Sequence, residues 1–369
     1  MNDTLRLFLA GDVMTGRGID QALAQPSDPV LYEDWIRNAR DYLGLAEHAN
    51  GPIAVPLAPE AVWGDALAAL DRAQPDLRIV NLETAVTRND EPWLGKGINY
   101  RMHPENVACL AAARLDCCTL ANNHVLDWGR AGLEETLDTL ARAGIQTAGA
   151  GRDLFQAQAP AILDVPGKGR VLVFAFGVGD SGVPAAWAAT NGGAGVALLE
   201  DLSADTVRQI TDLIARYRRQ RDLVVVSIHW GGNWGYAVPA AHRRFAHLLL
   251  DEAGVDVVHG HSSHHPKGLE VWQGKLVLYG CGDFLNDYEG IGGYEEFRGD
   301  LTTMVLATVA TATGRLVRLE LVPLQLRRLR LNRALPEDGR WLARTLATES
   351  ARLSTRIDAD DVGRMRWAG

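Results

Sequence analysis

The feature that most constrains the fold is an alternation of short apolar runs with longer helical patterns along most of the chain. The short runs have the length of buried strands, and the segments between them have the spacing of amphipathic helices. This alternation is typical of an α/β protein in which helices cover a mostly parallel sheet. The strands are expected at residues 5–10, 77–82, 116–120, 162–165, 171–177, 223–228 and 255–258.

The helices are expected between these strands, at residues 61–73, 104–114, 131–143, 204–221 and 239–253. Pro104 can open a helix at its first position, and Ser203 can cap one. From residue 269 to about residue 331 the period changes to two, which predicts an antiparallel β layer. We therefore expect a main domain at residues 1–334 and a mostly helical tail at residues 335–369 packed on it.

Composition limits the classes of function. The 369 residues are 47% hydrophobic, so the chain can form a full core without disulfides, and its four cysteines are expected to be buried thiols. A formal charge of −9 and the lack of a basic run argue against a nucleic-acid partner. No apolar stretch is long enough for a signal peptide or for membrane insertion, which favours a cytoplasmic location.

Polar residues that can bind a metal follow several of the predicted strands directly. Because the carboxyl ends of strands in an open α/β sheet line a crevice, we expect these side chains to meet there. Each alone has a plainer interpretation, since Gly-Asp is a common turn and a lone histidine is often a core residue. Together their carboxylate, amide and imidazole groups are the ligands of divalent ions. The candidates are Asp12, Glu83, Asn123, His124, His229, His259, His261, His264 and His265.

The order of these segments resembles the CapA family of capsule-synthesis, or poly-γ-glutamate biosynthesis, proteins. The similarity covers roughly residues 4–325, and its most specific part is Ala-Asn-Asn-His-Val-Leu-Asp-Trp-Gly at 121–129. The other matching segments are Gly-Asp-Val-Met at 11–14, Asn-Leu-Glu at 81–83, Tyr-Arg-Met at 100–102, His-Trp-Gly at 229–231, Gly-His-Ser-Ser-His at 260–264 and Gly-Asp-Phe at 282–284.

The resemblance implies a metallophosphatase-like four-layer α/β/β/α sandwich with two central mixed β-sheets. It also implies one or two divalent ions, which can be Mn, Ca, Mg, Fe or Zn. The implied metal ligands are Asp12, Glu83, Asn123, His229 and His261. The implied catalytic residues are His124 as a general acid, His264, which also matches a ligand position, and Arg101, which can clamp a carboxylate or phosphate.

Three departures from metallophosphatases bear on the metal. Met14 stands where those enzymes have a histidine ligand, Glu83 replaces an aspartate, and the histidine pair has the spacing His-x-x-His. One ion, or a weakly held Ca or Mg, is therefore as much expected as a strong dinuclear centre.

The function expected from these residues is that of a metal-dependent enzyme acting on a peptide or γ-glutamyl-type carboxylate substrate. Peptide Cα epimerisation and amide or phosphoester hydrolysis both fit, because histidines can transfer the protons of each. The alternative is a non-catalytic poly-γ-glutamate or capsule biosynthesis subunit that binds polymer. Trp230 and Tyr288 are candidate substrate-binding residues, with plain packing as the other interpretation. The tail can cap the sandwich or pair with a second subunit in a homodimer.

Overall fold

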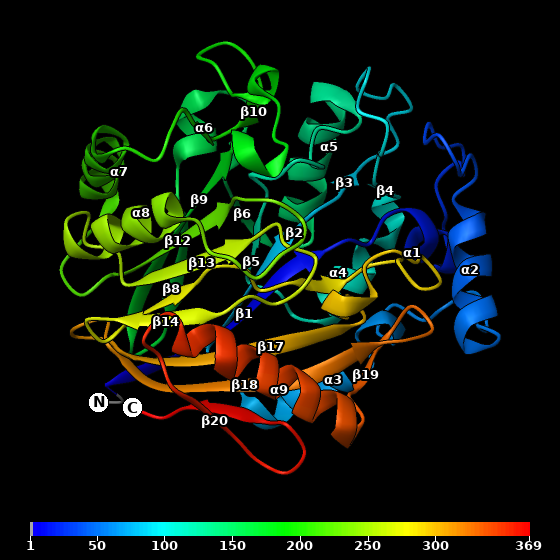
Figure 1. Ribbon diagram of the computed structural model, residues 1–369. Coiled ribbons are helices and arrows are strands. Elements are labelled where there is room, and N and C mark those ends of the chain that lie inside the picture. Colours follow the sequence, from blue (N-terminus) through cyan, green and yellow to red (C-terminus); the bar gives the residue numbers. More distant parts are fainter. Residues whose placement is uncertain (1–2) are drawn as a thin grey trace.

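Two mixed β-sheets form the centre of the protein, whose computed structural model describes residues 3–369 (Figure 1). The larger sheet has ten strands, and the first strand of the chain lies in its interior, between a parallel and an antiparallel neighbour. Its spatial order is β20 (Ile357–Ala359), β21 (Met365–Trp367), β18 (Leu316–Leu326), β17 (Leu301–Ala310), β1 (Thr4–Val13), β2 (Leu77–Leu82), β5 (Cys117–Thr119) and β6 (Gln146–Ala148), with β16 (Asp283–Leu285) paired to β1 and β19 (Leu331–Arg333) paired to β18.

The smaller sheet has seven strands. Its spatial order is β11 (Leu198–Leu199), β9 (Gly169–Val178), β12 (Leu223–His229), β13 (Val257–His261), β15 (Lys275–Leu278) and β14 (Leu269–Trp272), with β8 (Ala161–Val165) paired to β9. Two further pairs of short strands lie outside both sheets: β3 (Ala85–Val86) with β4 (Arg101–Met102), and β7 (Ala150–Gly151) with β10 (Gly195–Val196).

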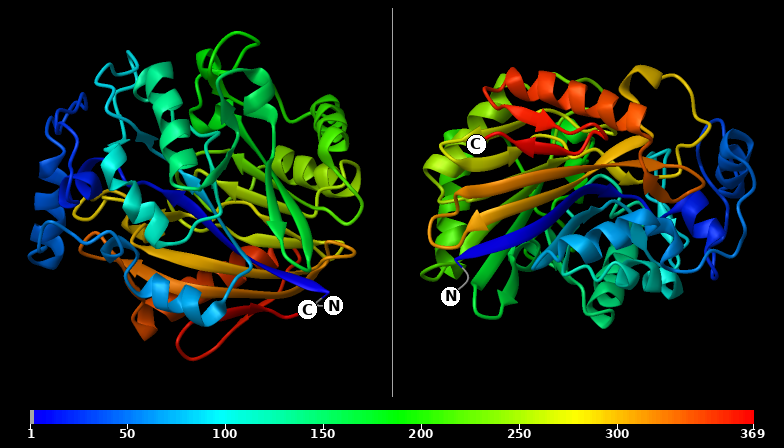
Figure 2. Two further views of the ribbon diagram at one scale, coloured as in Figure 1. Left: turned by 180° about the vertical axis from the view of Figure 1, so that it is seen from behind. Right: turned by 90° about the horizontal axis from the view of Figure 1, so that it is seen from below.

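The helices surround the two sheets (Figures 1 and 2). They are α1 (Arg17–Ala22), α2 (Arg40–Asn50), α3 (Asp65–Ala73), α4 (Ala108–Ala112), α5 (Gly129–Arg142), α6 (Leu154–Gln158), α7 (Ala204–Tyr217), α8 (Ala240–Asp251) and α9 (Pro336–Ala351), with short 3-10 helices at Ala61–Trp63, Pro104–Val107, Gly179–Ser181, Ala185–Trp187 and Glu295–Phe297. Within residues 3–369, none of these helices is both long and apolar enough to cross a bilayer.

Alternate residues of the smaller sheet belong to two different apolar cores. In β12, Val225 packs in the core shared with the larger sheet, whereas Val224 and Val226 pack with α7 and α8 on the other face. This two-sided burial follows from the period of two along a strand, and it explains why β12 reads as a continuous apolar run. The mixed α/β class is confirmed, and the four cysteines are buried and free as expected.

The expected strands and helices are present, with one interruption. The helix predicted at residues 61–73 is broken at Gly64, where φ is +45°. A Cβ atom at Gly64 would lie 2.0 Å from the carbonyl oxygen of Leu331, so the backbone of β19 approaches there too closely for any side chain.

The C-terminal third differs more from the prediction. The period-two region is not one antiparallel layer, because β16 pairs in parallel with β1 and β15 pairs in parallel with β13. The tail is not mostly helical: α9 is followed by the hairpin β20–β21, whose second strand pairs with β18 and extends the larger sheet. Buried Ile357 and Met365 fix this hairpin, and such three-residue strands leave little periodic signal.

Candidate metal site at the strand ends

The predicted ligands come from both sheets and meet where their strands end. Asp12 lies near the end of β1 and is the register partner of Asp283, the first residue of β16. Glu83 directly follows β2, the other parallel neighbour of β1. His229 and His261 are register partners that end β12 and β13. Parallel pairing of neighbouring strands thus places each group beside the next.

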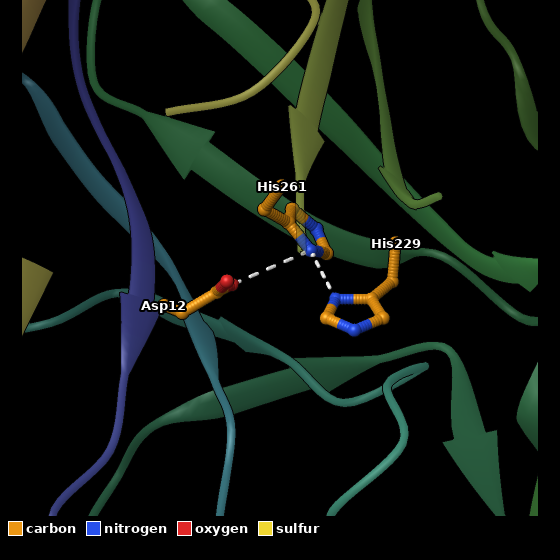
Figure 3. A group of neighbouring side chains, drawn as sticks. All are labelled: Asp12, His229 and His261. Atoms are coloured by element: carbon orange, nitrogen blue, oxygen red, sulfur yellow. Dashed lines mark hydrogen bonds and ion pairs between the residues drawn. The ribbon is translucent and has the colours of Figure 1, made fainter. Parts of the chain in front are cut away.

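Three of these residues form a compact cluster of metal-binding groups (Figure 3). The Nδ1 atoms of His229 and His261 are 2.9 Å apart, and His261 Nδ1 is 3.7 Å from Asp12 Oδ1. All three side chains are buried, and one donor atom from each lies within 4.8 Å of the others. Two imidazoles and a carboxylate at this separation can hold one transition-metal ion.

A chain of hydrogen bonds orients the His261 ring toward this cluster. His259 Nε2 lies 2.8 Å from the Ala10 carbonyl oxygen, which only accepts, so Nε2 carries the proton. His259 Nδ1 is then an acceptor for the Ser227 hydroxyl at 3.2 Å, and Ser227 Oγ accepts from His261 Nε2 at 2.8 Å. Ser227 Oγ lies equally close, at 3.2 Å, to Thr119 Oγ1. When its single proton goes to His259 Nδ1, both nitrogens of His259 and Nε2 of His261 are satisfied, which leaves the lone pair of His261 Nδ1 facing the cluster.

Buried polar atoms without partners are a further observation that fits a divalent cation at this site. His229 Nε2 and Asn123 Oδ1 are buried and have no hydrogen-bond partner in residues 3–369. Buried polar atoms usually have partners, so an unpartnered nitrogen within the cluster, such as His229 Nε2, is consistent with a missing water or ion. The facing His229 and His261 nitrogens also need a proton or a cation between them, because two lone pairs at 2.9 Å repel.

The carboxylates on the other side of the site crowd one another. Burial and the charge of Asp283 raise the pKa of Asp12 to about 7, although Asn81 Nδ2 donates to Asp12 Oδ1 at 2.7 Å. Burial and the charges of Asp12 and Asp283 raise the pKa of Glu83 well above its usual value. Like charges packed in a buried space favour the protonated state, and a bound divalent ion relieves the same repulsion.

His124 is held as a neutral imidazole. Its Nδ1 lies 2.6 Å from Asp127 Oδ2 and its Nε2 lies 3.8 Å from Glu83 Oε1. Burial lowers the pKa of His124 to about 4, more than the Asp127 charge raises it. The proton of the neutral ring therefore sits on Nδ1, where Asp127 accepts it, and the lone pair of Nε2 faces the site.

His264 has the opposite protonation preference. Burial by itself would lower its pKa, but the charge and hydrogen bond of Asp283, whose Oδ1 lies 3.0 Å from His264 Nδ1, raise the pKa above the usual value. The site thus contains one histidine poised to accept a proton and another poised to donate one.

Two tyrosines lie between these histidines. The ring of Tyr100 packs edge-on against His124 with centroids 4.5 Å apart, and Tyr288 packs edge-on against His264 at 5.2 Å. Their hydroxyl groups are 3.0 Å apart. Tyr288 also lines a cavity of about 320 Å³, together with Trp234 and Asn286. Of the predicted substrate-binding residues, Tyr288 is therefore the one beside the site.

The side chains of Trp230 and Arg101 contact other parts of the fold, and their substrate-binding and catalytic roles stay predictions. Trp230 is 2% exposed, stacks on His242 and donates its indole N–H to the Tyr279 carbonyl, which are packing contacts. The Arg101 guanidinium donates to the carbonyls of Asn89 and Asp28 and lies 3.8 Å from the centroid of the Trp128 ring. Those bonds connect two loops, and the buried Nε of Arg101 has no partner within residues 3–369.

Sequence reasoning missed three residues of the site. Asp283 follows a glycine just as Asp12 does, and that repeated Gly-Asp was the available signal. Asp127 lies three residues after His124, in the turn that precedes α5, a spacing that permits their contact. Ser227 gave no signal, because a lone serine within an apolar strand is commonplace.

The chain is similar in sequence to known bacterial proteins. A model of the family "Bacterial capsule synthesis protein PGA_cap" matches residues 6–288, which include every residue of the candidate site. The chain is 45% identical over 356 residues to a probable polyglutamine synthesis accessory protein of Mycobacterium tuberculosis, covering 96% of this chain and 93% of that protein. It is 29% identical over 290 residues to the PGA biosynthesis protein CapA of Bacillus subtilis, covering 78% and 64%.

Solved structures are only distantly similar. GAP50, the anchor in the inner membrane complex of Plasmodium, matches at 8% identity with a TM-score of 0.32, covering 86% of this chain and 88% of that one. A likeness at that level does not assign the arrangement of layers.

Proposed function

The chain belongs to the bacterial capsule synthesis protein family, and on that premise we propose that it is a metal-dependent enzyme acting on a peptide or γ-glutamyl-type carboxylate substrate. The observation that carries the proposal is the buried cluster of Asp12, His229 and His261, flanked by His124 and His264 with opposite protonation preferences. The names of the relatives refer to polyglutamine and PGA synthesis, and they support a polymer substrate; the glutamyl-type carboxylate follows from the family resemblance.

Asp12, His229 and His261 would hold the ion, with Glu83 and Asn123 as further oxygen donors. A bound divalent ion supplies a Lewis acid that polarises a carbonyl or carboxylate oxygen. The same charge offsets the crowding of buried carboxylates around Asp12, so binding of the ion and ionisation of Asp12 favour each other.

The two histidines supply the proton transfers. His124 accepts a proton at Nε2 while Asp127 keeps its Nδ1–H oriented, and His264 donates from Nε2 while Asp283 holds its Nδ1–H. The family resemblance implied a general acid at His124. Its lowered pKa favours the role of base instead, and the raised pKa of His264 favours the role of acid.

This pair serves two reaction types. In Cα epimerisation His124 removes the proton next to the polarised carbonyl, and His264 returns one from another direction. In hydrolysis His124 takes a proton from the attacking water, and His264 protonates the leaving nitrogen or oxygen. Phosphoester hydrolysis rests on the metallophosphatase-like four-layer fold alone, which is analogy rather than site chemistry.

The experiment is incubation of the metal-loaded protein in D2O with γ-linked glutamate oligomers, α-linked peptides and a phosphate ester. A gain of about one mass unit without cleavage supports epimerisation, whereas fragments or free phosphate support hydrolysis. His124→Gln and His264→Gln should each abolish the change while metal content stays the same. Metal-loaded protein that changes none of these substrates would contradict the enzyme proposal.

The second candidate is a non-catalytic biosynthesis subunit that binds polymer. Met14 favours it, because this buried side chain offers the site no strong ligand and its sulfur instead lies 3.8 Å from the Tyr288 hydroxyl. Binding of a glutamate oligomer without chemical change, in both the presence and the absence of metal, would support this role.

A further inference from the structure

The helix α3 and the C-terminal hairpin both lie along the larger sheet (Figure 2, right). A basic groove is lined by residues of α3, β18 and this hairpin, and none of the candidate metal ligands is among its lining residues. It consists of two cavities of about 280 and 440 Å³ that share Ala69, Arg72, Val322 and Arg364 in their walls, so they form one continuous feature. We call it the arginine groove. The arginines that line it are Arg6, Arg72, Arg318, Arg333, Arg364 and Arg366.

The charges of the groove are unbalanced. Two carboxylates, Asp65 and Glu320, stand against the six arginines, which leaves a net charge of plus four in a chain whose total is −9. Arg6, Arg318 and Arg366 all turn to Glu320. One carboxylate therefore pairs with three guanidinium groups, and the local potential stays positive.

The other three arginines have no acidic partner. Within residues 3–369, no carboxylate oxygen lies within 4 Å of a side-chain nitrogen of Arg72, Arg333 or Arg364, and all three are exposed. Asp65 accepts only the backbone N–H of Arg333, at 2.9 Å. Clustered cations without counter-charges repel one another, so an anionic ligand is favoured there.

The walls indicate which polyanion fits. Between the arginines the groove is lined by aliphatic side chains such as Leu321, Val322 and Met365, and no aromatic ring is among its described lining residues. Single-stranded nucleic acids depend on aromatic rings for base stacking. A chain of carboxylates needs only guanidinium forks and aliphatic contacts, which the groove supplies.

We infer that the arginine groove binds an acidic glutamyl polymer, as a second site for the substrate class named above; this rests on the proposed function only for the identity of the polymer. Arg6 precedes Asp12 by six residues on β1, about 20 Å along a strand, so the groove is separate from the metal cluster. Two separate contacts on one polymer raise its effective concentration at either. Most of the groove lies beyond residue 288, where the family match ends.

The test measures binding of fluorescent γ-linked glutamate oligomers by anisotropy at low and high salt. The groove variant carries Arg72→Gln, Arg333→Gln and Arg364→Gln, which break no ion pair. Its control carries Arg37→Gln, Arg216→Gln and Arg244→Gln, an equal charge change at exposed arginines elsewhere. We expect about tenfold weaker binding for the groove variant and little change for the control.

Equal losses in both variants, or tighter binding of single-stranded DNA than of the oligomer, would overturn the inference. The failure of the proposed function is a separate outcome. Metal-stripped protein should still bind the oligomer through the groove, whether or not the metal-loaded protein changes any substrate. Conversely, turnover of short peptides combined with unaltered oligomer binding by the groove variant would refute the groove and leave the enzyme proposal standing.

Discussion

The two sheets contribute opposite chemistry to one site. The larger sheet brings carboxylates, Asp12, Glu83 and Asp283, whereas the smaller sheet brings the imidazoles of His229 and His261. Burial raises the pKa values of Asp12 and Glu83, and it lowers those of His229 and His261. Without a cation, burial therefore disfavours the carboxylate form of the acids and the protonated form of the histidines. The site therefore costs stability on each sheet, which is a mark of function.

The largest expected effect comes from removing one ligand of either sheet. Asp12→Ala and His261→Ala should each weaken metal binding by more than about 100-fold, beyond what the loss of a supporting residue causes. Calorimetric titration and metal analysis after dialysis measure this. His48→Ala, an exposed histidine, is the control. If both variants retain the metal of the unmodified protein, the ligand assignment is wrong.

A smaller loss should follow from breaking the hydrogen-bond chain on the imidazole side. Ser227→Ala should weaken metal binding by about 10- to 100-fold, because His261 loses the partner that fixes its tautomer. In the metal-free protein, ¹⁵N chemical shifts should place the His261 proton on Nε2, and Ser227→Ala should mix the tautomers. Thr119→Val is the comparison variant: it removes the competing acceptor of the Ser227 hydroxyl, so it should leave the His261 proton on Nε2. A proton on Nδ1 in the unmodified protein would contradict the argument.

On the carboxylate side, the raised pKa of Asp12 predicts that the stability of the metal-free protein depends on pH. The folded pKa of Asp12 is about 7 and its usual value is 3.8, so the metal-free native state binds more protons than the unfolded state between these values. The stability contributed by protonated Asp12 is complete below pH 3.8 and is lost as the pH rises through 7.

The imidazole side has the opposite slope. The folded pKa of His259, in β13 of the smaller sheet, is about 4 against a usual 6.5, so its contribution is lost as the pH falls through that interval. The variant Glu83→Gln distinguishes the two contributions, because it removes a carboxylate and leaves every histidine in place. In denaturant unfolding of the metal-free proteins, the free energy of unfolding of this variant should rise relative to that of the unmodified protein as the pH rises above 4.5, by up to ~1.4 kcal/mol per pH unit. A pH-independent difference would contradict the raised pKa of Glu83.

The smallest effect should come from Trp230, which belongs to neither set of ligands. Trp230→Phe removes one hydrogen bond to the Tyr279 carbonyl and should lower the free energy of unfolding by about 1 kcal/mol. Metal and oligomer affinities should not change. A selective loss of oligomer binding would support Trp230 as a substrate-binding residue.

Residues that end an uninterrupted apolar run could be predicted from the sequence. Asp12 and His229 are examples, because each polar residue directly follows its strand in the sequence and parallel pairing brings the ends of neighbouring strands together. Asp283 had only the repeated Gly-Asp as a signal, which does not reveal its place, since that depends on pairing between β16 and β1 across most of the chain. Arg101 shows another limit: its residue type and motif suit an anion, but its partners are loop carbonyls that only the tertiary fold brings near.

The interior position of β1 has a consequence for the order of synthesis. Among the strands of residues 3–369, β1 leaves the ribosome before all others, yet its antiparallel neighbour β17 ends at Ala310. At roughly 5–20 residues per second, one edge of β1 waits on the order of 15–60 s for that neighbour. Asp12 is made more than 200 residues before His229, His261 and Asp283. The proposed cluster is therefore complete only late in synthesis, and an ion that it binds would enter at that stage.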